Sequence, residues 1–196
     1  MARREALKRP YQQKRRAEQT AETRQRIVEA AIDLHTDIGP GRTTISMVAE
    51  RAGVQRHTFY AHFPDERSLL LACSGEALAR DPLPDANPWR EIARPKARLN
   101  AGLTALYDWY GRNADLTACV LRDAEYHELV REVSAQRWGP CIALLFEVLG
   151  EGLAPRQMAL LRLAASFHTW RSLVRESGLD AEAAAEMMTT AILAKA

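Results

Sequence analysis

A cluster of hydrogen-bond donors lies between positions 55 and 62 of this 196-residue chain. It contains Arg56, His57, Thr58, Tyr60 and His62. Side chains of these types donate to phosphate oxygens and to the edges of nucleic acid bases, and together they are too polar for a hydrophobic core. The spacing therefore predicts an exposed surface that binds DNA.

Two short helical patterns joined by a tight turn are expected to position these donors. Thr43 or Thr44 can cap the first helix with its hydroxyl group. The inward face of that helix is predicted to carry Val48, Ala49 and Ala52. Gly53 then allows the turn, because glycine takes positive φ at no steric cost. The second helix buries Phe59 and Phe63, which completes the layout of a helix-turn-helix.

The region around this turn resembles the DNA-binding domain of the TetR family of bacterial transcriptional regulators over residues 24–72. The resemblance is carried by residues that match in register: Ile27, Ala30, Ala31, Leu34, Gly39, Thr43, Thr44, Val48, Ala49, Ala52, Gly53, Val54, Thr58, Tyr60, His62, Phe63, Leu69 and Leu70. It implies a dimer that places two recognition helices about 34 to 36 Å apart on a palindromic operator.

The residues expected to contact DNA come from both helices of the motif. They are Thr43, Thr44, Ser46, Gln55, Arg56, His57, Thr58, Tyr60 and His62. The resemblance makes Tyr60 and His62 phosphate anchors. Arg56 and His57 stand near the start of the second helix, where side chains meet base edges first, and Arg56 is predicted to read a guanine.

Two positions depart from the family pattern. His57 stands where the family usually has a small residue, and Glu66 stands where it has a lysine that binds phosphate. A carboxylate is repelled by the DNA backbone, so the family's phosphate contact at this corner is not carried over. Arg67 is adjacent and offers a substitute for the lysine.

Positive charge is concentrated before the helix-turn-helix. Residues 1–26 hold nine Lys or Arg and three Glu, whereas the whole chain carries a formal charge of only +2. Such a segment can lie along phosphates or enter the minor groove, or it can be a solubilising tail. Pro10 and the scarcity of apolar residues predict a flexible basic arm over residues 1–19, with little order before about Gln19.

Length and composition restrict the class of protein. With 47% apolar residues the chain can bury a core, yet its apolar runs are far shorter than the ~20 residues that span a bilayer. The N-terminus lacks the pattern of a secretory signal. Cys73, Cys119 and Cys141 form no CxxC pair and are expected to be buried, inert thiols. These features predict a cytoplasmic protein with no membrane contact.

The predicted fold is all-α, with about nine helices. A helix-turn-helix domain over residues 20–65 precedes a helical effector-binding and dimerisation domain over residues 66–196. Asp65 is expected to cap a connector helix that ends before Asp81. Further helical patterns run from about Trp89 to Arg112, through Leu116–Leu121, through Leu129–Leu149 with Pro140 inside, from Pro155 to Gly178, and after Asp180.

The last two patterns are apolar over a wide arc and predict a homodimer, because helices apolar on more than one face need a second partner. Aromatic and polar residues of the second domain predict a cavity for a small-molecule effector of unknown identity. The candidate lining is Tyr107, Tyr110, Arg122, Tyr126, Trp138, Phe167, His168 and Arg171. An aromatic-rich lining favours a hydrophobic or aromatic compound.

These features favour a dimeric repressor that a small-molecule effector releases from its operator, and no cofactor is predicted. An activator of the same fold and a low-specificity architectural DNA-binding protein are the alternatives. An enzyme is not expected. Asp123 and His127 share a helical face, but two ligands are too few for a catalytic metal site and no metal is predicted.

Overall fold

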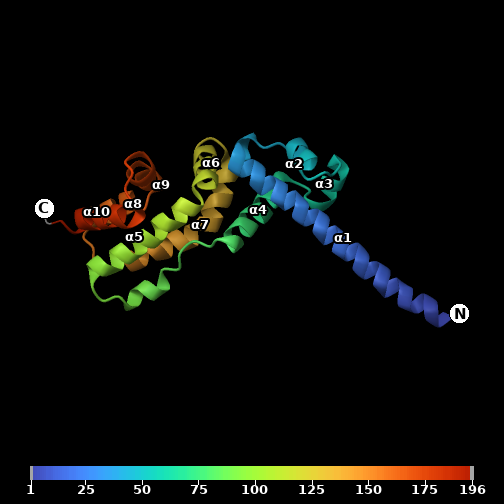
Figure 1. Ribbon diagram of the computed structural model, residues 1–196, viewed down its shortest axis with the longest axis horizontal. Coiled ribbons are helices and arrows are strands. Elements are labelled where there is room, and N and C mark those ends of the chain that lie inside the picture. Colours follow the sequence, from blue (N-terminus) through green and yellow to red (C-terminus); the bar gives the residue numbers. More distant parts are fainter. Residues whose placement is uncertain (1, 195–196) are drawn as a thin grey trace.

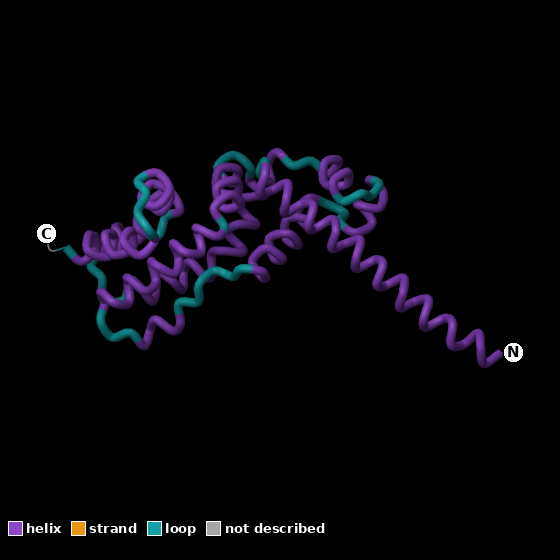
Figure 2. Tube along the Cα trace, viewed as in Figure 1, coloured by secondary structure: helices purple, strands orange, loops and turns teal. Residues whose placement is uncertain are grey.

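The computed structural model describes residues 2–194, and the side chains from Gln12 to Ala194. This part of the chain contains ten α-helices and no β-strand, which confirms the all-α prediction (Figure 1). Figure 2 shows that the helices are joined by short loops, apart from the longer connection after α4. Across residues 2–194 no helix has the length and apolarity needed to cross a membrane.

Four helices share the N-terminal hydrophobic core, and one of them is the connector helix that the sequence assigned to the second domain, because Leu69, Leu70 and Cys73 are buried in this core. They are α1 (Ala2–Asp37), α2 (Ile45–Arg51), α3 (Arg56–His62) and α4 (Glu66–Arg80), with a 3-10 turn η1 at Pro40–Arg42. Ile27, Phe59 and Phe63 are almost fully buried in this core, and Val130 and Val133 of a later helix also join it. The two domains are therefore packed together through the N-terminal core.

The remaining helices form the second domain. They are α5 (Pro95–Arg112), α6 (Ala114–Ala124), α7 (Glu128–Leu149), α8 (Pro155–Ala164), α9 (Phe167–Trp170) and α10 (Ala181–Leu193), with a 3-10 turn η2 at Asn87–Glu91 and a π-helical segment η3 at Arg171–Glu176. In Figure 1, α8 to α10 lie at the opposite end of the molecule from α2 and α3. The predicted cap at Asp65 is confirmed, because its carboxylate accepts the Ser68 N–H at 2.7 Å, and Asp180 caps α10 by accepting the Ala183 N–H at 2.7 Å.

The helix expected from Pro155 to Gly178 is broken at Ala165 and Ser166, which is why the structure has one more helix than predicted. The hydroxyl of Tyr107 donates to the Ala164 carbonyl at 2.8 Å, and that of Tyr110 donates to the Ala165 carbonyl at 2.9 Å. These bonds satisfy carbonyls that a helix end leaves unpaired. The Ser166 hydroxyl then accepts the His168 N–H and starts α9.

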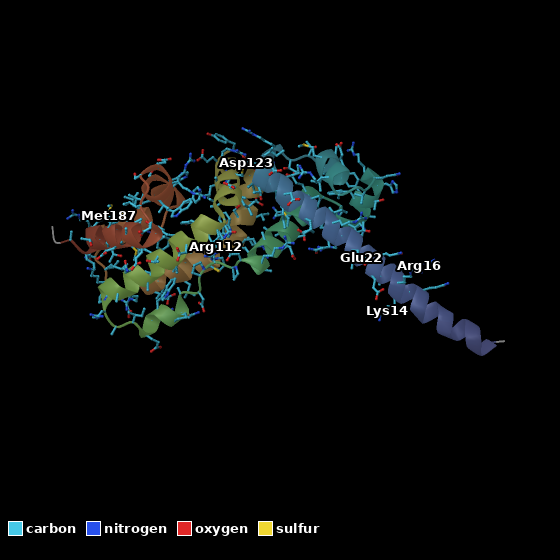
Figure 3. The ribbon with its side chains drawn as sticks, in the orientation of Figure 1. Lys14, Arg16, Glu22, Arg112, Asp123 and Met187 are labelled. Carbon is cyan, nitrogen blue, oxygen red and sulfur yellow. The ribbon has the colours of Figure 1, made fainter. Side chains whose placement is uncertain are left out.

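The basic N-terminal segment is helical from Ala2 onward, whereas the sequence predicted little order before about Gln19. Its side chains from Gln12 to Glu22 are exposed, so burial does not explain the helix. Ala, Glu, Gln, Lys and Arg dominate the segment, and all have high helix propensity. Figure 1 shows this part of α1 projecting away from the body, and Figure 3 marks Lys14, Arg16 and Glu22 along it.

Candidate nucleic-acid interface and interdomain cavity

The turn between α2 and α3 has the geometry that the sequence predicted. Thr44 caps α2, because its hydroxyl oxygen accepts the Met47 N–H at 3.3 Å. Gly53 has φ 66°, and the following Val54 N–H donates to the Ala49 carbonyl at 2.9 Å. These bonds fix the angle at which the second helix leaves the turn.

Buried aromatic residues hold the recognition helix α3 against the N-terminal core. Phe59 and Phe63 are buried with their ring centroids 5.9 Å apart. The Arg24 guanidinium of α1 covers the outer face of the Phe63 ring at 4.9 Å. The helix has only seven residues, so this packing rather than its own length must hold it in place.

The opposite face of α3 is free for recognition. Arg56 and His57 are exposed at its start, and 43% of Tyr60 is exposed one turn later. Thr58 and His62 are half-buried at the edges of this face. Positive or neutral donors thus occupy the outer surface of the short helix, which is the arrangement needed to enter a DNA groove.

The other predicted contacts surround α3 at the starts of the two helices. Gln55 precedes α3 and is exposed, and Thr44 and Ser46 are exposed at the start of α2. Thr43 is the exception, since its hydroxyl donates to the Gly39 carbonyl at 2.8 Å. The structure therefore gathers the predicted set on one motif, with Thr43 also used to hold the loop after α1.

The corner at the start of α4 faces the second domain. Arg67 forms an ion pair with Glu132 of α7, and the Glu66 carboxylate lies 3.6 Å from His127 Nε2. In this structure Arg67 is therefore engaged in an interdomain contact.

An ion pair on α6 fastens the second domain to the end of α1. The Asp123 side chain is only 8% exposed, and its carboxylate accepts the Gly41 N–H at 2.8 Å and Arg122 Nε at 2.8 Å. Arg122 also donates to the Ile38 carbonyl at 2.7 Å. We call these contacts of Asp123 and Arg122 the latch; Figure 3 places Asp123 where α6 meets α1.

The loop at the latch requires glycine. Gly39 has φ 95°, and a Cβ atom there would lie 2.3 Å from both the Arg122 guanidinium and an Asp123 carboxylate oxygen. Burial raises the pKa of Asp123, but the bonds from Arg122 and Gly41 outweigh it, so the pKa falls below its ordinary value. Asp123 is thus ionised and has a structural role, because its carboxylate binds Gly41 and Arg122.

A cavity lies between the two domains. The space between its walls amounts to about 610 Å³, including the part open to solvent. We call it the interdomain cavity. Its walls come from α1, α4, α5, α6 and α7: His35, Pro40, Leu70, Cys73, Ser74, Ala77, Leu78, Asp81, Trp109, Asn113, Leu116, Thr117, Val120, Val130, Val133, Ser134, Arg137 and Trp138.

Of the eight residues predicted to line an effector cavity, only Trp138 lines this one. Tyr107, Tyr110 and Phe167 belong to the packed core of the second domain. Tyr126 is 86% exposed and His168 is exposed beside the break after α8. The two arginines form ion pairs, Arg122 with Asp123 and Arg171 with Glu176.

Two titratable groups in the cavity wall are uncharged at neutral pH. Burial lowers the pKa of His35 to about 4, although Asp123 opposes the shift. Burial also raises the pKa of Cys73 to about 12, and its Sγ lies 3.4 Å from His35 Nδ1. Cys73 and Cys119 are buried as predicted, but Cys141 is exposed on α7.

Comparison with known proteins identifies the N-terminal domain. The profile of the family described as "Bacterial regulatory proteins, tetR family" matches residues 27–73. An uncharacterized HTH-type transcriptional regulator from Mycobacterium tuberculosis is 42% identical over 52 residues, which are 26% of this chain and 28% of that protein. The class A tetracycline repressor protein of transposon 1721 from Escherichia coli is 36% identical over 76 residues, or 37% and 35% of the two chains.

The chain spans about a quarter to a half of the length of these curated relatives. Solved structures resemble it over more of its length. FadR from Bacillus subtilis in complex with stearoyl-CoA superposes with a TM-score of 0.63, covering 87% of this chain and 97% of FadR at 17% identity. GusR from Salmonella enterica gives a TM-score of 0.60 over 88% and 95% of the chains at 19% identity. At this identity the likeness concerns the fold.

Proposed function

We propose that this chain, which belongs to the TetR family through its N-terminal domain, is a dimeric repressor that binds a palindromic operator and is released by a small molecule. The observation that carries the proposal is the exposed donor face of α3, whose opposite face packs on the core through the buried Phe59 and Phe63. This role places the protein in the cytoplasm with the bacterial chromosome, and it requires no catalytic step.

Sequence recognition is assigned to the start of α3, where Arg56 and His57 are exposed. A guanidinium can donate two bonds to a guanine edge, a geometry that distinguishes base pairs. Tyr60 and His62 are assigned to phosphates. The exposed cations of α1, including Lys14 and Arg16, add attraction that is independent of sequence and sensitive to salt.

Dimerisation is assigned to the surfaces of α8 and α10. Their exposed residues include uncharged stripes at helical spacing, which are Ala159 and Leu163 on α8 and Ala183, Met187, Thr190 and Ala191 on α10. Leu163 is 55% and Met187 50% exposed. Small and apolar residues on neighbouring helices allow close approach of a second copy about a two-fold axis. Figure 3 places Met187 far from the recognition helix, which leaves α3 free for DNA.

Effector release is assigned to the interdomain cavity. His35 of α1 and Leu70 of α4 line it together with Val130 and Trp138 of α7, so a ligand there touches both domains at once. A ligand that binds better to a conformation with displaced recognition helices draws the protein off its operator. Coupling of about 1 to 3 kcal/mol changes operator affinity roughly 5- to 150-fold. FadR shows that a protein of this fold can hold a small molecule.

Selection of genomic fragments by the purified protein, followed by competition binding at physiological salt, tests the proposal. The Arg56→Ala variant is expected to lose about 1 to 3 kcal/mol of operator binding and less on random DNA. Arg94→Ala, an exposed arginine of the second domain, serves as the control. Equal loss on both DNAs would refute base reading, and no preference in the unaltered protein would favour an architectural role.

The same DNA-binding surface would serve an activator bound upstream of a promoter. Transcription in a reconstituted system with the selected operator separates the two signs of regulation. Repression requires that added protein lowers transcript yield, and an increase would assign the chain as an activator.

A further inference from the structure

The interdomain cavity has one charge that no group among the described side chains neutralises. Arg137 of α7 lines the cavity, and no carboxylate of the described residues lies within 4.0 Å of it. Its Nη2 atom donates to the Leu71 carbonyl, and its Nε donates to the Ser74 hydroxyl at 3.3 Å. Its Nη1 group donates to no acceptor among the residues with described side chains.

The other ionisable groups of the wall contribute no net charge. Asp81 is held by two bonds from Arg112, at 2.9 and 3.1 Å, and by the Asn113 amide at 2.7 Å. The bond from Arg112 is the main cause that lowers the pKa of Asp81, so the pair stays ionised and neutral overall. His35 and Cys73 are uncharged at neutral pH. The cavity therefore carries a single positive charge.

The rest of the wall is mainly apolar. Leu70, Leu78, Leu116, Val120, Val130 and Val133 line it together with two indole rings, Trp109 and Trp138, which meet edge to face at 6.4 Å. A ligand that fits such a wall is largely apolar, with few polar groups to orient it. A ligand that also neutralises the cavity carries one negative charge, and a carboxylate supplies that single charge in a planar form that a guanidinium can bind with two parallel bonds.

We propose that the effector of this protein is a hydrophobic carboxylic acid, bound as its anion with the carboxylate on Arg137 and the apolar body between Trp109 and the leucines and valines of the wall. The inference deepens the proposed function and rests on it for its regulatory meaning.

The position of Arg137 also links such a ligand to the connector helix. Its two protein bonds go to the Leu71 carbonyl and the Ser74 hydroxyl, and both acceptors belong to α4. A carboxylate that accepts parallel bonds from Nη1 and Nη2 shares Nη2 with the Leu71 carbonyl and so competes with that bond. Binding of the anion would therefore loosen or shift α4, the helix that follows directly on the recognition helix.

Binding of matched probes to the full-length protein without DNA tests the assignment. The probes are naphthalene carboxylate, its neutral carboxamide and naphthylmethylamine, with decanoate and decanamide as the aliphatic pair. Tryptophan fluorescence reports binding through Trp109 and Trp138. We expect at least one acid to bind about tenfold or more tightly than its amide, because only the carboxylate neutralises the Arg137 charge and can accept two parallel bonds from its guanidinium. An amide or amine that binds as well as the acids, or no binding by either acid, overturns the proposal.

A variant series locates the carboxylate. Arg137→Gln should abolish the preference for acid over amide, Arg137→Lys should keep part of it, and Arg131→Gln should keep all of it, because Arg131 is exposed on the same helix. Retained preference in Arg137→Gln refutes the site. If Arg137→Gln does not fold, the preference for acid over amide in the unaltered protein and in Arg137→Lys still decides whether Arg137 binds the carboxylate. Operator binding is measured separately. Acid binding without sequence-specific DNA binding contradicts only the proposed function. Sequence-specific DNA binding without acid binding contradicts only this inference.

Discussion

Removal of the latch carboxylate by Asp123→Ala is expected to destabilise the protein and to weaken the attachment of α6 to the end of α1. The Asp123 side chain is 8% exposed and accepts bonds from the Gly41 N–H and from Arg122 Nε, both at 2.8 Å. A hydrogen bond to a charged group contributes about 1.5 to 3 kcal/mol. The Arg122 side chain is 41% exposed, so solvent replaces much of its share.

The expected loss is therefore about 2 to 3 kcal/mol, most of it from the Gly41 bond and from leaving that N–H without its partner. For a domain of this size, 1 kcal/mol shifts the Tm by about 2 to 4 °C, so the variant should melt roughly 4 to 12 °C lower. Thermal unfolding followed by circular dichroism measures this, with Asp33→Ala as the control because Asp33 is an exposed aspartate of α1.

The same variant tests how the two domains communicate. Because the latch joins α6 to the end of α1, we expect Asp123→Ala to bind the operator with near-normal affinity and to lose part of the effector-induced release. A Tm within about 1 °C of that of Asp33→Ala would show that the Gly41 and Arg122 contacts contribute nothing measurable to stability. Undiminished release in a destabilised Asp123→Ala protein would show that the latch does not transmit the signal.

Three further outcomes follow from the contacts described. Met187→Glu should raise the dimer dissociation constant at least about tenfold in analytical ultracentrifugation, because carboxylates meet at a two-fold interface, whereas Tyr126→Glu should not. Gly39→Ala should unfold at a lower urea concentration, since the new Cβ meets the latch at positive φ, and an unchanged midpoint would contradict the geometry. The pKa of Asp123 is lowered in the folded state, so its contribution is present above the ordinary Asp pKa of about 3.9 and is lost as the pH falls through the lower folded value. The Tm gap between the unaltered protein and Asp123→Asn should therefore shrink below about pH 4, and a gap that widens there would refute the assignment.

The helix-turn-helix could be predicted from sequence because its signals are local. The Thr44 cap, the Gly53 turn and the buried pair Phe59 and Phe63 all lie within about twenty residues, where periodicity is a reliable guide. The break after α8 could not be predicted in this way. It depends on hydroxyl groups of Tyr107 and Tyr110, which lie more than fifty positions earlier in the chain and reach the Ala164 and Ala165 carbonyls only in the folded protein.

The predicted cavity lining followed aromatic content instead of charge on an apolar face, and seven of its eight residues lie outside the interdomain cavity. Tyr107, Tyr110 and Phe167 were chosen for their rings, and the fold uses them as core. The sequence spacing of Arg137 could have indicated the cavity. Arg137 follows the buried Val130 and Val133 at a spacing of seven and four, so it shares their helical face, and a cation on a buried face indicates either a partner or a binding site.

Under the proposed function, two attachments between the domains would couple ligand binding to movement of the recognition helix. The latch holds α6 to the end of α1, while Arg137 holds α7 to the middle of α4. Between these attachments lies the interdomain cavity, and His35 and Leu70 bring the N-terminal core directly into its wall. A ligand that releases only the Arg137 attachment leaves the latch as the fixed point. If the proposed effector release is correct, we expect the N-terminal domain to pivot about the end of α1, and α3, which packs in the same small core, to be displaced.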